Sequence, residues 1–148
     1  MISVDTNIVF YATQPDSPLH SRAQAWMETL VEREDVAVSE LMLAELYCLL
    51  RNPSANRRPL AAEQAVELIQ GYRQHPRWRL LGLSEARHEL HDEIWAMAAK
   101  PGGAFRRIYD VRLAISLLRQ GVDEFATANL KDFQNLGFRR VWNPLTEA

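Results

Sequence analysis

Residues 1–10 read MISVDTNIVF, and this stretch places three polar side chains where a buried strand should end. Ile2–Asp5 has the pattern of a short buried strand, and Asn7–Ala12 that of one or two helical turns. An isolated aspartate at such a junction is most often a helix cap. Thr6 and Asn7 can also cap a helix, so the triplet holds more polar groups than a cap requires. The surplus makes Asp5 a candidate functional residue.

The overall composition limits the classes to which the protein can belong. The chain has 148 residues, 47% of them hydrophobic and 24% charged, which predicts one globular domain over residues 1–148. Its formal net charge of −2 means that nucleic-acid binding would need a local basic patch. We expect a cytoplasmic protein with no membrane partner, because neither a membrane-length apolar run nor a signal-type start is present. Cys48 is the single cysteine, and its leucine-rich surroundings predict a small buried hydrophobic residue.

Short apolar segments alternate with helical patterns along the rest of the chain. Strands are expected at residues 36–38, 78–83, 124–127 and 139–142, and helices at residues 19–34, 40–51, 61–73, 84–100 and 108–120. Ser39 is expected to cap the second of these helices, and the polar, proline-bounded residues 52–59 to form a loop. This alternation predicts an α/β sandwich around a mostly parallel sheet. In such sheets, functional groups gather beyond the carboxyl ends of the strands.

Two further acids lie in helical patterns among apolar neighbours. All four residues at three and four positions from Glu45 are apolar, and a carboxylate on such a face must be paired, neutralised or bound to a cation. Asp110 shares its face with apolar residues and lies near a helix N-terminus, where the helix dipole also favours an anion. A buried ion pair for Glu45 and a capping role for Asp110 are the structural alternatives.

Asp132 and Asn129 follow the strand expected at residues 124–127, where either one alone would be an ordinary loop residue. The α/β arrangement sends at least three of the four acids to one edge of the sheet. Converging carboxylates repel each other unless a cation is bound, and hard oxygen ligands of this kind suit Mg²⁺ or Mn²⁺. We therefore interpret Asp5 as a metal ligand that Thr6 and Asn7 orient. Such a site activates water and stabilises a phosphodiester leaving group.

The sequence resembles the PIN-domain nucleases, particularly the VapC-type toxins of bacterial toxin–antitoxin pairs. The resemblance rests on VDTNIVFYA at residues 4–12, SELMLAEL at 39–46, YDVRLAISLLRQG at 109–121 and FATANLKDF at 125–133. It implies a three-layer α/β/α sandwich and an endoribonuclease that hydrolyses RNA phosphodiester bonds with a metal-activated water. It also implies a homodimer that a cognate VapB-type antitoxin neutralises.

The resemblance assigns roles to individual residues. It carries metal-ligand and catalytic roles over to Asp5, Glu45 and Asp110, and Asp132 best matches the fourth acidic place. Thr127 and Asn129 match polar groups that support the ligands or orient the substrate, as Thr6 and Asn7 do. The sequence departs from the family pattern at Val111 and Arg112, where small or apolar residues are common, and residues 52–103 match no family motif.

Two sets of arginines lie beside the proposed ligands in the sequence: Arg51, Arg57 and Arg58, and Arg106 and Arg107. A single surface arginine is most often only solvated, but these sets could hold RNA phosphates near the metal. The four tryptophans are interpreted as core or dimer-interface residues. His88 and His91 lack a third ligand for a zinc site and are interpreted as solvated helix residues.

Two other functions compete with the nuclease hypothesis. Phosphoryl transfer through an aspartyl intermediate would need a second aspartate two residues after Asp5, and Asn7 occupies that position. An inactive PIN-like or receiver-like module would bind metal without cleaving RNA. The ribonuclease toxin remains the leading hypothesis, and the binding module is its alternative.

Overall fold

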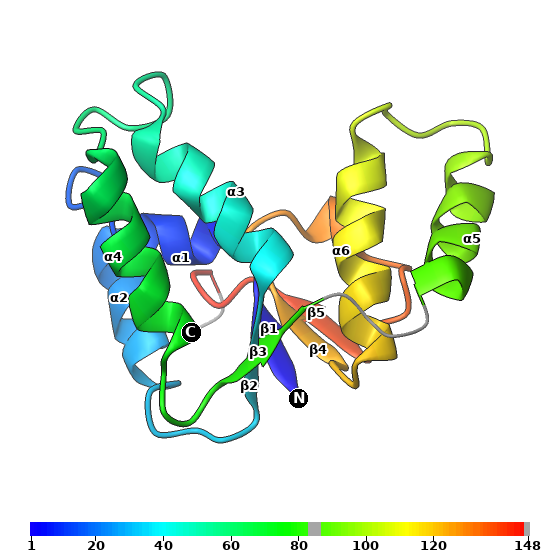
Figure 1. Ribbon diagram of the computed structural model, residues 1–148, viewed down its shortest axis with the longest axis horizontal. Helices are drawn as coiled ribbons and strands as arrows, with labels where there is room; N and C mark the ends of the chain where they lie inside the picture. Colours follow the sequence, from blue (N-terminus) through cyan, green and yellow to red (C-terminus); the bar gives the residue numbers. More distant parts are fainter. Residues whose placement is uncertain (83–86, 147–148) are drawn as a thin grey trace.

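A computed structural model describes residues 1–82 and 87–146, and a parallel sheet is at its centre (Figure 1). The strands within the described residues are β1 (Ile2–Val4), β2 (Val36–Ser39), β3 (Arg79–Leu81), β4 (Glu124–Ala126) and β5 (Arg140–Trp142). The helices are α1 (Thr6–Ala12), α2 (His20–Glu28), α3 (Glu40–Arg51), α4 (Ala62–Arg73), α5 (Arg87–Ala98), α6 (Arg107–Arg119) and α7 (Leu130–Phe133). The strand order is β3-β2-β1-β4-β5, and every neighbouring pair is parallel. The predicted mostly parallel sheet is confirmed.

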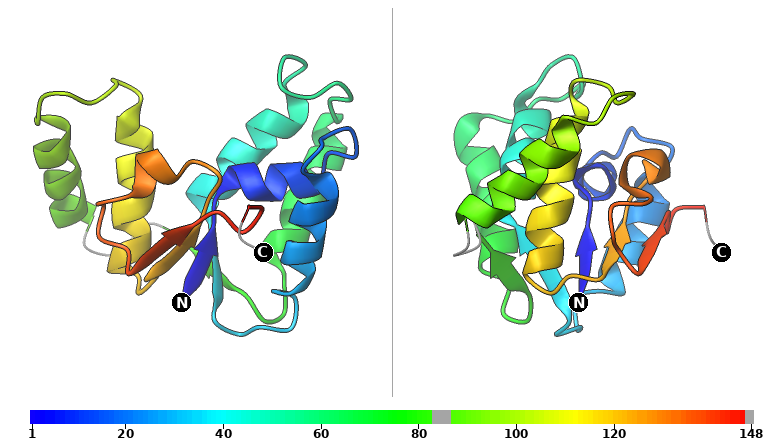
Figure 2. Two further views of the ribbon diagram at one scale, coloured as in Figure 1. Left: turned by 180° about the vertical axis from the view of Figure 1, so that it is seen from behind. Right: turned by 90° about the vertical axis from the view of Figure 1, so that its right-hand side faces the viewer.

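Helices cover both faces of this sheet. Helices α1 to α4 lie on one side, and α5 and α6 lie on the other (Figures 1 and 2). Ile2 and Val4 of β1 pack with the α1–α4 layer, whereas Phe125 of β4 packs with the α5–α6 layer. Successive strand residues thus point to opposite faces, and each face buries a separate apolar cluster. The predicted three-layer α/β/α sandwich is confirmed.

Some helix boundaries differ from those expected. The side chain of Ser39 accepts a hydrogen bond from the Leu41 amide (3.2 Å) and caps α3, as predicted. Helix α2 ends at Glu28 rather than at residue 34, because successive turn-type bonds such as Leu30 N–H to the Met27 carbonyl replace the helical pattern. The start expected for α5, at residues 84–86, lies outside the described residues.

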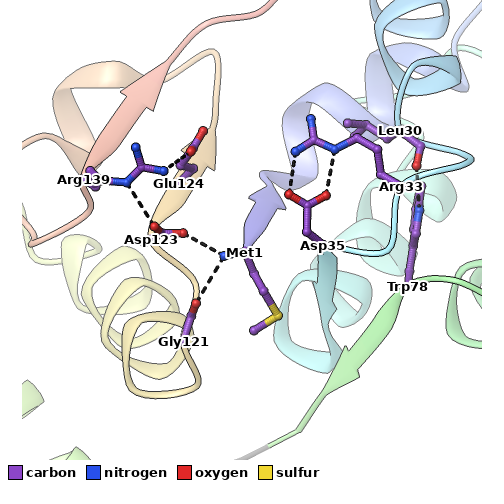
Figure 3. Close-up of polar contacts among 9 residues, drawn as sticks. All are labelled: Met1, Leu30, Arg33, Asp35, Trp78, Gly121, Asp123, Glu124 and Arg139. Atoms are coloured by element: carbon purple, nitrogen blue, oxygen red, sulfur yellow. Dashed lines mark hydrogen bonds and ion pairs between the residues drawn. The ribbon is translucent and has the colours of Figure 1, made fainter.

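Ion pairs hold the amino-terminal edge of the sheet together (Figure 3). The Met1 ammonium group donates to Asp123 (2.8 Å) just before β4, and Arg139, just before β5, bonds to both Asp123 and Glu124. Arg33 pairs with Asp35 at the start of β2 (2.7 Å). These partners are exposed or half-buried, so each pair contributes little stability by itself. Together they connect the starts of β1, β4 and β5.

The opposite edge carries the candidate site. The chain leaves β1 toward β2 on one side, and β4 pairs with β1 on the other, so the strand order reverses at β1. Crevices outside the carboxyl ends of strands at such a reversal are where α/β sheets bind ligands. Val4 pairs with Ala126, which places Asp5 beside Thr127. In the described part of the chain, no helix has the length and apolar character needed to cross a membrane.

Candidate active site

Asp5 lies at the centre of this edge, buried between β1 and β4. Asp5 is only 6% exposed. Its Oδ2 accepts hydrogen bonds from Thr127 Oγ1 (2.6 Å) and Asn7 Nδ2 (2.9 Å). Asn7 in turn accepts a bond from the Ala128 amide (3.2 Å) through its Oδ1. Asp5 occupies the N-cap position of α1 but its side chain makes no capping hydrogen bond. The simple cap interpretation is therefore wrong, because this carboxylate is oriented by side chains instead.

The environment of Asp5 opposes its ionisation. Burial raises its pKa, and the negative charges of Glu45 and Asp110 raise it further, whereas the Thr127 hydrogen bond lowers it. The net result is a pKa of about 7 for Asp5. An ionised Asp5 is thus held in the fold at a free-energy cost on the order of 4 kcal/mol relative to a solvated aspartate.

Glu45 comes from the middle of α3 and is solvent-exposed. Its Oε2 accepts a hydrogen bond from Thr6 Oγ1 (3.2 Å), and the same hydroxyl lies 3.3 Å from the Met42 carbonyl. The expectation that Glu45 lies on a buried apolar face is therefore wrong. The apolar residues around it in the sequence include Cys48, which is also exposed rather than buried as predicted. Because Glu45 and Cys48 are both exposed, the apolar spacing along α3 did not indicate that this face is buried.

Asp110 lies in the first turn of α6 and is half-buried. Burial raises its pKa to about 6, and the charges of Asp132 and Glu45 add to that rise, while Arg107 opposes it. Asp132 is exposed in α7, a short helix that the sequence pattern did not reveal. The four acids from separate elements therefore influence each other electrostatically. Figure 1 shows α3 and α6 on either side of the carboxyl end of β1.

The carboxylates do not form a complete set of metal ligands by themselves. Among residues 1–82 and 87–146, no three acidic, histidine or cysteine side chains already surround one point. Mg²⁺ usually keeps several waters and binds one or two carboxylates directly. Mutually repelling carboxylate oxygens, with Asp5 buried, match a hydrated cation of this kind, because its charge would relieve the repulsion. The donor set thus fits a hard divalent metal.

The other polar residues predicted for the site take different positions. Thr127 is fully buried and accepts a bond from the Asn129 amide (2.9 Å), whereas Asn129 itself is exposed. Arg107 acts electrostatically on Asp110. Arg51 instead stacks on the Tyr47 ring, 5.6 Å from its centroid, and Arg58 lies 3.8 Å from Asp16. None of the described contacts connects Arg51, Arg57 or Arg58 to the four acids of the candidate site.

Exposed aromatic side chains near α6 were not identified from the sequence. Phe105 is 90% exposed and Tyr109 is 66% exposed, on either side of Arg106 and Arg107. The interleaving of aromatic and basic residues in FRRIY (105–109) was the available signal. Trp95 is 63% exposed, so it is not a core residue of this chain, in contrast to Trp142.

Comparisons with known proteins agree with this architecture. Residues 2–131 match the family described as "PIN domain". The chain is 47% identical to "Ribonuclease VapC24" of Mycobacterium tuberculosis over 146 residues, 99% of this chain and 98% of the relative. Two similar solved structures are Mycobacterium tuberculosis VapC20, described as a sarcin–ricin loop cleaving toxin, and FitAB bound to a DNA fragment. VapC20 has 18% identity and a TM-score of 0.63, covering 93% of this chain and 96% of VapC20. FitAB has 22% identity and a TM-score of 0.66, covering 100% of this chain and 98% of that one.

Proposed function

The chain belongs to the PIN-domain family, and on that premise we propose that it is a metal-dependent endoribonuclease, the toxin of a toxin–antitoxin pair. The name of its relative, Ribonuclease VapC24, supports RNA as the substrate. The observation that carries the proposal is the buried, negatively charged site around Asp5. A carboxyl with a pKa of about 7, surrounded by other acids, is costly unless it binds a cation.

Asp5, Glu45 and Asp110 would hold the cation, and Asp132 would contribute from α7. Mg²⁺ or Mn²⁺, when bound there, would neutralise these charges, lower the pKa of a water and stabilise negative charge on the phosphodiester. Thr127 and Asn7 fix the orientation of Asp5 through their hydrogen bonds, and Thr6 fixes Glu45. Arg107, beside Asp110, would hold a phosphate of the RNA, as would Arg106. The reaction needs no side-chain nucleophile.

The proposal also covers the setting in which the chain acts. We place the reaction in the cytoplasm, where its RNA substrate lies, and treat residues 1–148 as one PIN-like domain. A cognate VapB-type antitoxin and a second copy of the chain are the expected protein partners. These partners follow from the resemblance to VapC-type toxins, which covers nearly the whole sequence.

The deciding experiment is incubation of the purified chain with total cellular RNA in chelator, Mg²⁺ or Mn²⁺, followed by mapping of the cut ends. Wild type should cut only with metal. Asp5→Asn and Asp110→Asn should each abolish cutting while remaining folded, because a neutral amide binds hard cations poorly. Asp92→Asn removes an exposed acid of α5 and should cut as wild type does.

Two outcomes would contradict the proposal. If folded Asp5→Asn and Asp110→Asn cut RNA at the wild-type rate, the site is elsewhere. If wild type binds the metal, measured by calorimetry, but leaves RNA intact under all conditions, the chain is a binding module rather than a nuclease.

A further inference from the structure

A cavity of about 330 Å³ lies between the end of α5 and the start of α6, the helix that also carries Asp110. The connecting loop, with Gly102 and Gly103, forms its rim. Its lining combines apolar and cationic side chains, among them Met97, Lys100, Phe105, Arg107 and Ile108. None of the described residues that line it is acidic. This volume is large enough for one planar heterocycle.

The charge around the cavity favours an anion. Between Glu93 and Asp110 the sequence holds no acid and three cations, Lys100, Arg106 and Arg107, in a chain whose net charge is −2. Phe105, which lines the cavity, is 90% exposed. A ring left in water beside cationic side chains is the arrangement on which proteins stack unpaired bases of single-stranded nucleic acids.

Arg107 connects the cavity with the carboxylates. It lines the cavity, and its Cδ would lie 3.6 Å from a Cβ at Gly103, so it packs against the rim. Asp110 is three residues further along α6, which makes the two side chains neighbours on the helix surface. A phosphate that reaches Arg107 would therefore lie near both Asp110 and the cavity.

We propose that this cavity binds one unpaired nucleobase of the RNA, next to the phosphodiester that is cut, with Phe105 stacking on the base and Arg107 holding its phosphate. This inference rests on the proposed nuclease function and adds a base-binding subsite to it. A base paired in a helix cannot enter such a cavity.

The test uses a short single-stranded RNA that carries a cut site mapped in total RNA. Each nucleotide flanking the cut is replaced in turn by an abasic one. For wild type, one abasic position should lower kcat/KM about tenfold, chiefly by raising KM. Phe105→Ala should lower kcat/KM similarly on intact RNA and then lose its sensitivity to that abasic position. The two changes thus act on one interaction and are not additive.

Two variants serve as controls. Phe105→Trp keeps an aromatic face and should restore both the rate and the abasic sensitivity. Trp95→Ala removes another exposed aromatic residue, on α5 and outside the cavity lining, and should behave as wild type. Phe105 is nearly fully exposed, so these substitutions should leave the melting temperature unchanged.

Other outcomes would overturn the inference and remain distinguishable from failure of the nuclease proposal. Wild type that cuts RNA but tolerates an abasic nucleotide at every flanking position refutes the base site alone. If, in addition, Phe105→Ala changes the molecular mass measured by light scattering, the surface belongs to a contact with a second copy. Wild type that cuts no RNA with any metal refutes the nuclease function itself.

Discussion

Thr127 favours the ionised form of Asp5, because its hydroxyl donates the shortest hydrogen bond that Asp5 receives from a described side chain (2.6 Å). That bond lowers the pKa of Asp5 against the effect of burial. Thr127→Val should therefore raise this pKa further and weaken metal binding. We expect a loss of about tenfold or more in cleavage rate at pH 7, partly recovered at higher pH.

A pH–rate profile of the Thr127→Val variant measures this effect. Thr29→Val is a matched control, since the exposed Thr29 hydroxyl donates its hydrogen bond to the carbonyl of Trp26 at the end of α2. An unchanged acid limb of the profile in Thr127→Val would mean that the hydroxyl does not tune Asp5.

The raised pKa of Asp5 also makes the stability of the metal-free protein depend on pH. In the folded chain Asp5 has a pKa of about 7, whereas an unfolded aspartate has about 3.9. Between these values the folded state binds the proton more tightly, so stability should fall as the pH rises from about 4 to 7. Carboxyls with lowered pKa values, such as Asp35 and Asp123, act mainly below this window.

Urea unfolding in chelator between pH 4.5 and 7.5, for wild type and Asp5→Asn, isolates this contribution. The lowered pKa of His75, caused mainly by burial, acts with the opposite sign but is common to both proteins. The difference in stability between the variant and wild type should grow with pH. A constant difference would mean that Asp5 is not protonated in the folded state.

At the residue scale, the sequence predicted which acids belong to the candidate site better than it predicted whether each acid is buried. Asp5 and Asp110 stood out because a strand end and a helix start placed acids beside apolar residues, and both are at least half-buried. Glu45 stood out for the same reason, yet it is exposed. Helical spacing shows which residues share a face, but the packing of other elements decides whether that face is covered. That information comes from contacts distant in sequence.

The start of α6 carries Arg107, which acts electrostatically on Asp110, and Arg106 precedes it, whereas Arg57 and Arg58 follow the end of α3. If Arg106 and Arg107 hold phosphates, Arg106→Ala with Arg107→Ala should weaken RNA binding. The slope of log K against log[salt] should also flatten by roughly one to two. Binding is measured in chelator, with the RNA intact.

The double variant Arg57→Ala with Arg58→Ala removes the same charge from the loop after α3. Arg58 lies near Asp16, so part of its charge is already balanced within the chain. We expect a smaller change of the salt slope for this pair. Equal slopes for both double variants would show that the position of the arginines on α6 has no special importance.

Among the helices, those with long periodic patterns were predictable, and the shortest, α7, was not. The alternation of apolar strands and amphipathic helices predicted where β1 to β5 and the longer helices lie in the sequence, but not the order of the strands in the sheet. Helix α7 has only four residues, too few for a period to be detected. Helix α2 ends early because turn-type bonds at Thr29 and Leu30 replace the helix, although the apolar spacing continues to Leu30, which is buried.

At the scale of the whole molecule, the strand order creates the site. Because β4 pairs with β1, Thr127 lies beside Asp5 although the two are 122 positions apart in the sequence. The two strand ends therefore meet only in the folded protein. Helices α3 and α6, from opposite layers, then bring their acids to the same edge. The full fold must therefore form before the negative charges approach each other, and folding does work against their repulsion.

The final prediction follows from that repulsion. Asp110→Asn removes one charge from the set with little change of shape. In chelator, the variant should melt at or above the temperature of wild type. With saturating Mg²⁺ or Mn²⁺, wild type should gain stability, because a ligand that binds only the folded state stabilises it. At a hundredfold excess over Kd the gain is about 2.7 kcal/mol, or about 5–10 °C in Tm for a chain of this size. The variant should gain much less.

A structural ion pair involving Asp110 predicts the reverse in chelator, since losing one partner of a buried pair costs roughly 3–5 kcal/mol. Thermal melts of both proteins, each with chelator and with metal, separate the two interpretations. A strongly destabilised variant, together with a wild type that does not respond to metal, would make Asp110 a structural residue and remove the main support for the nuclease site.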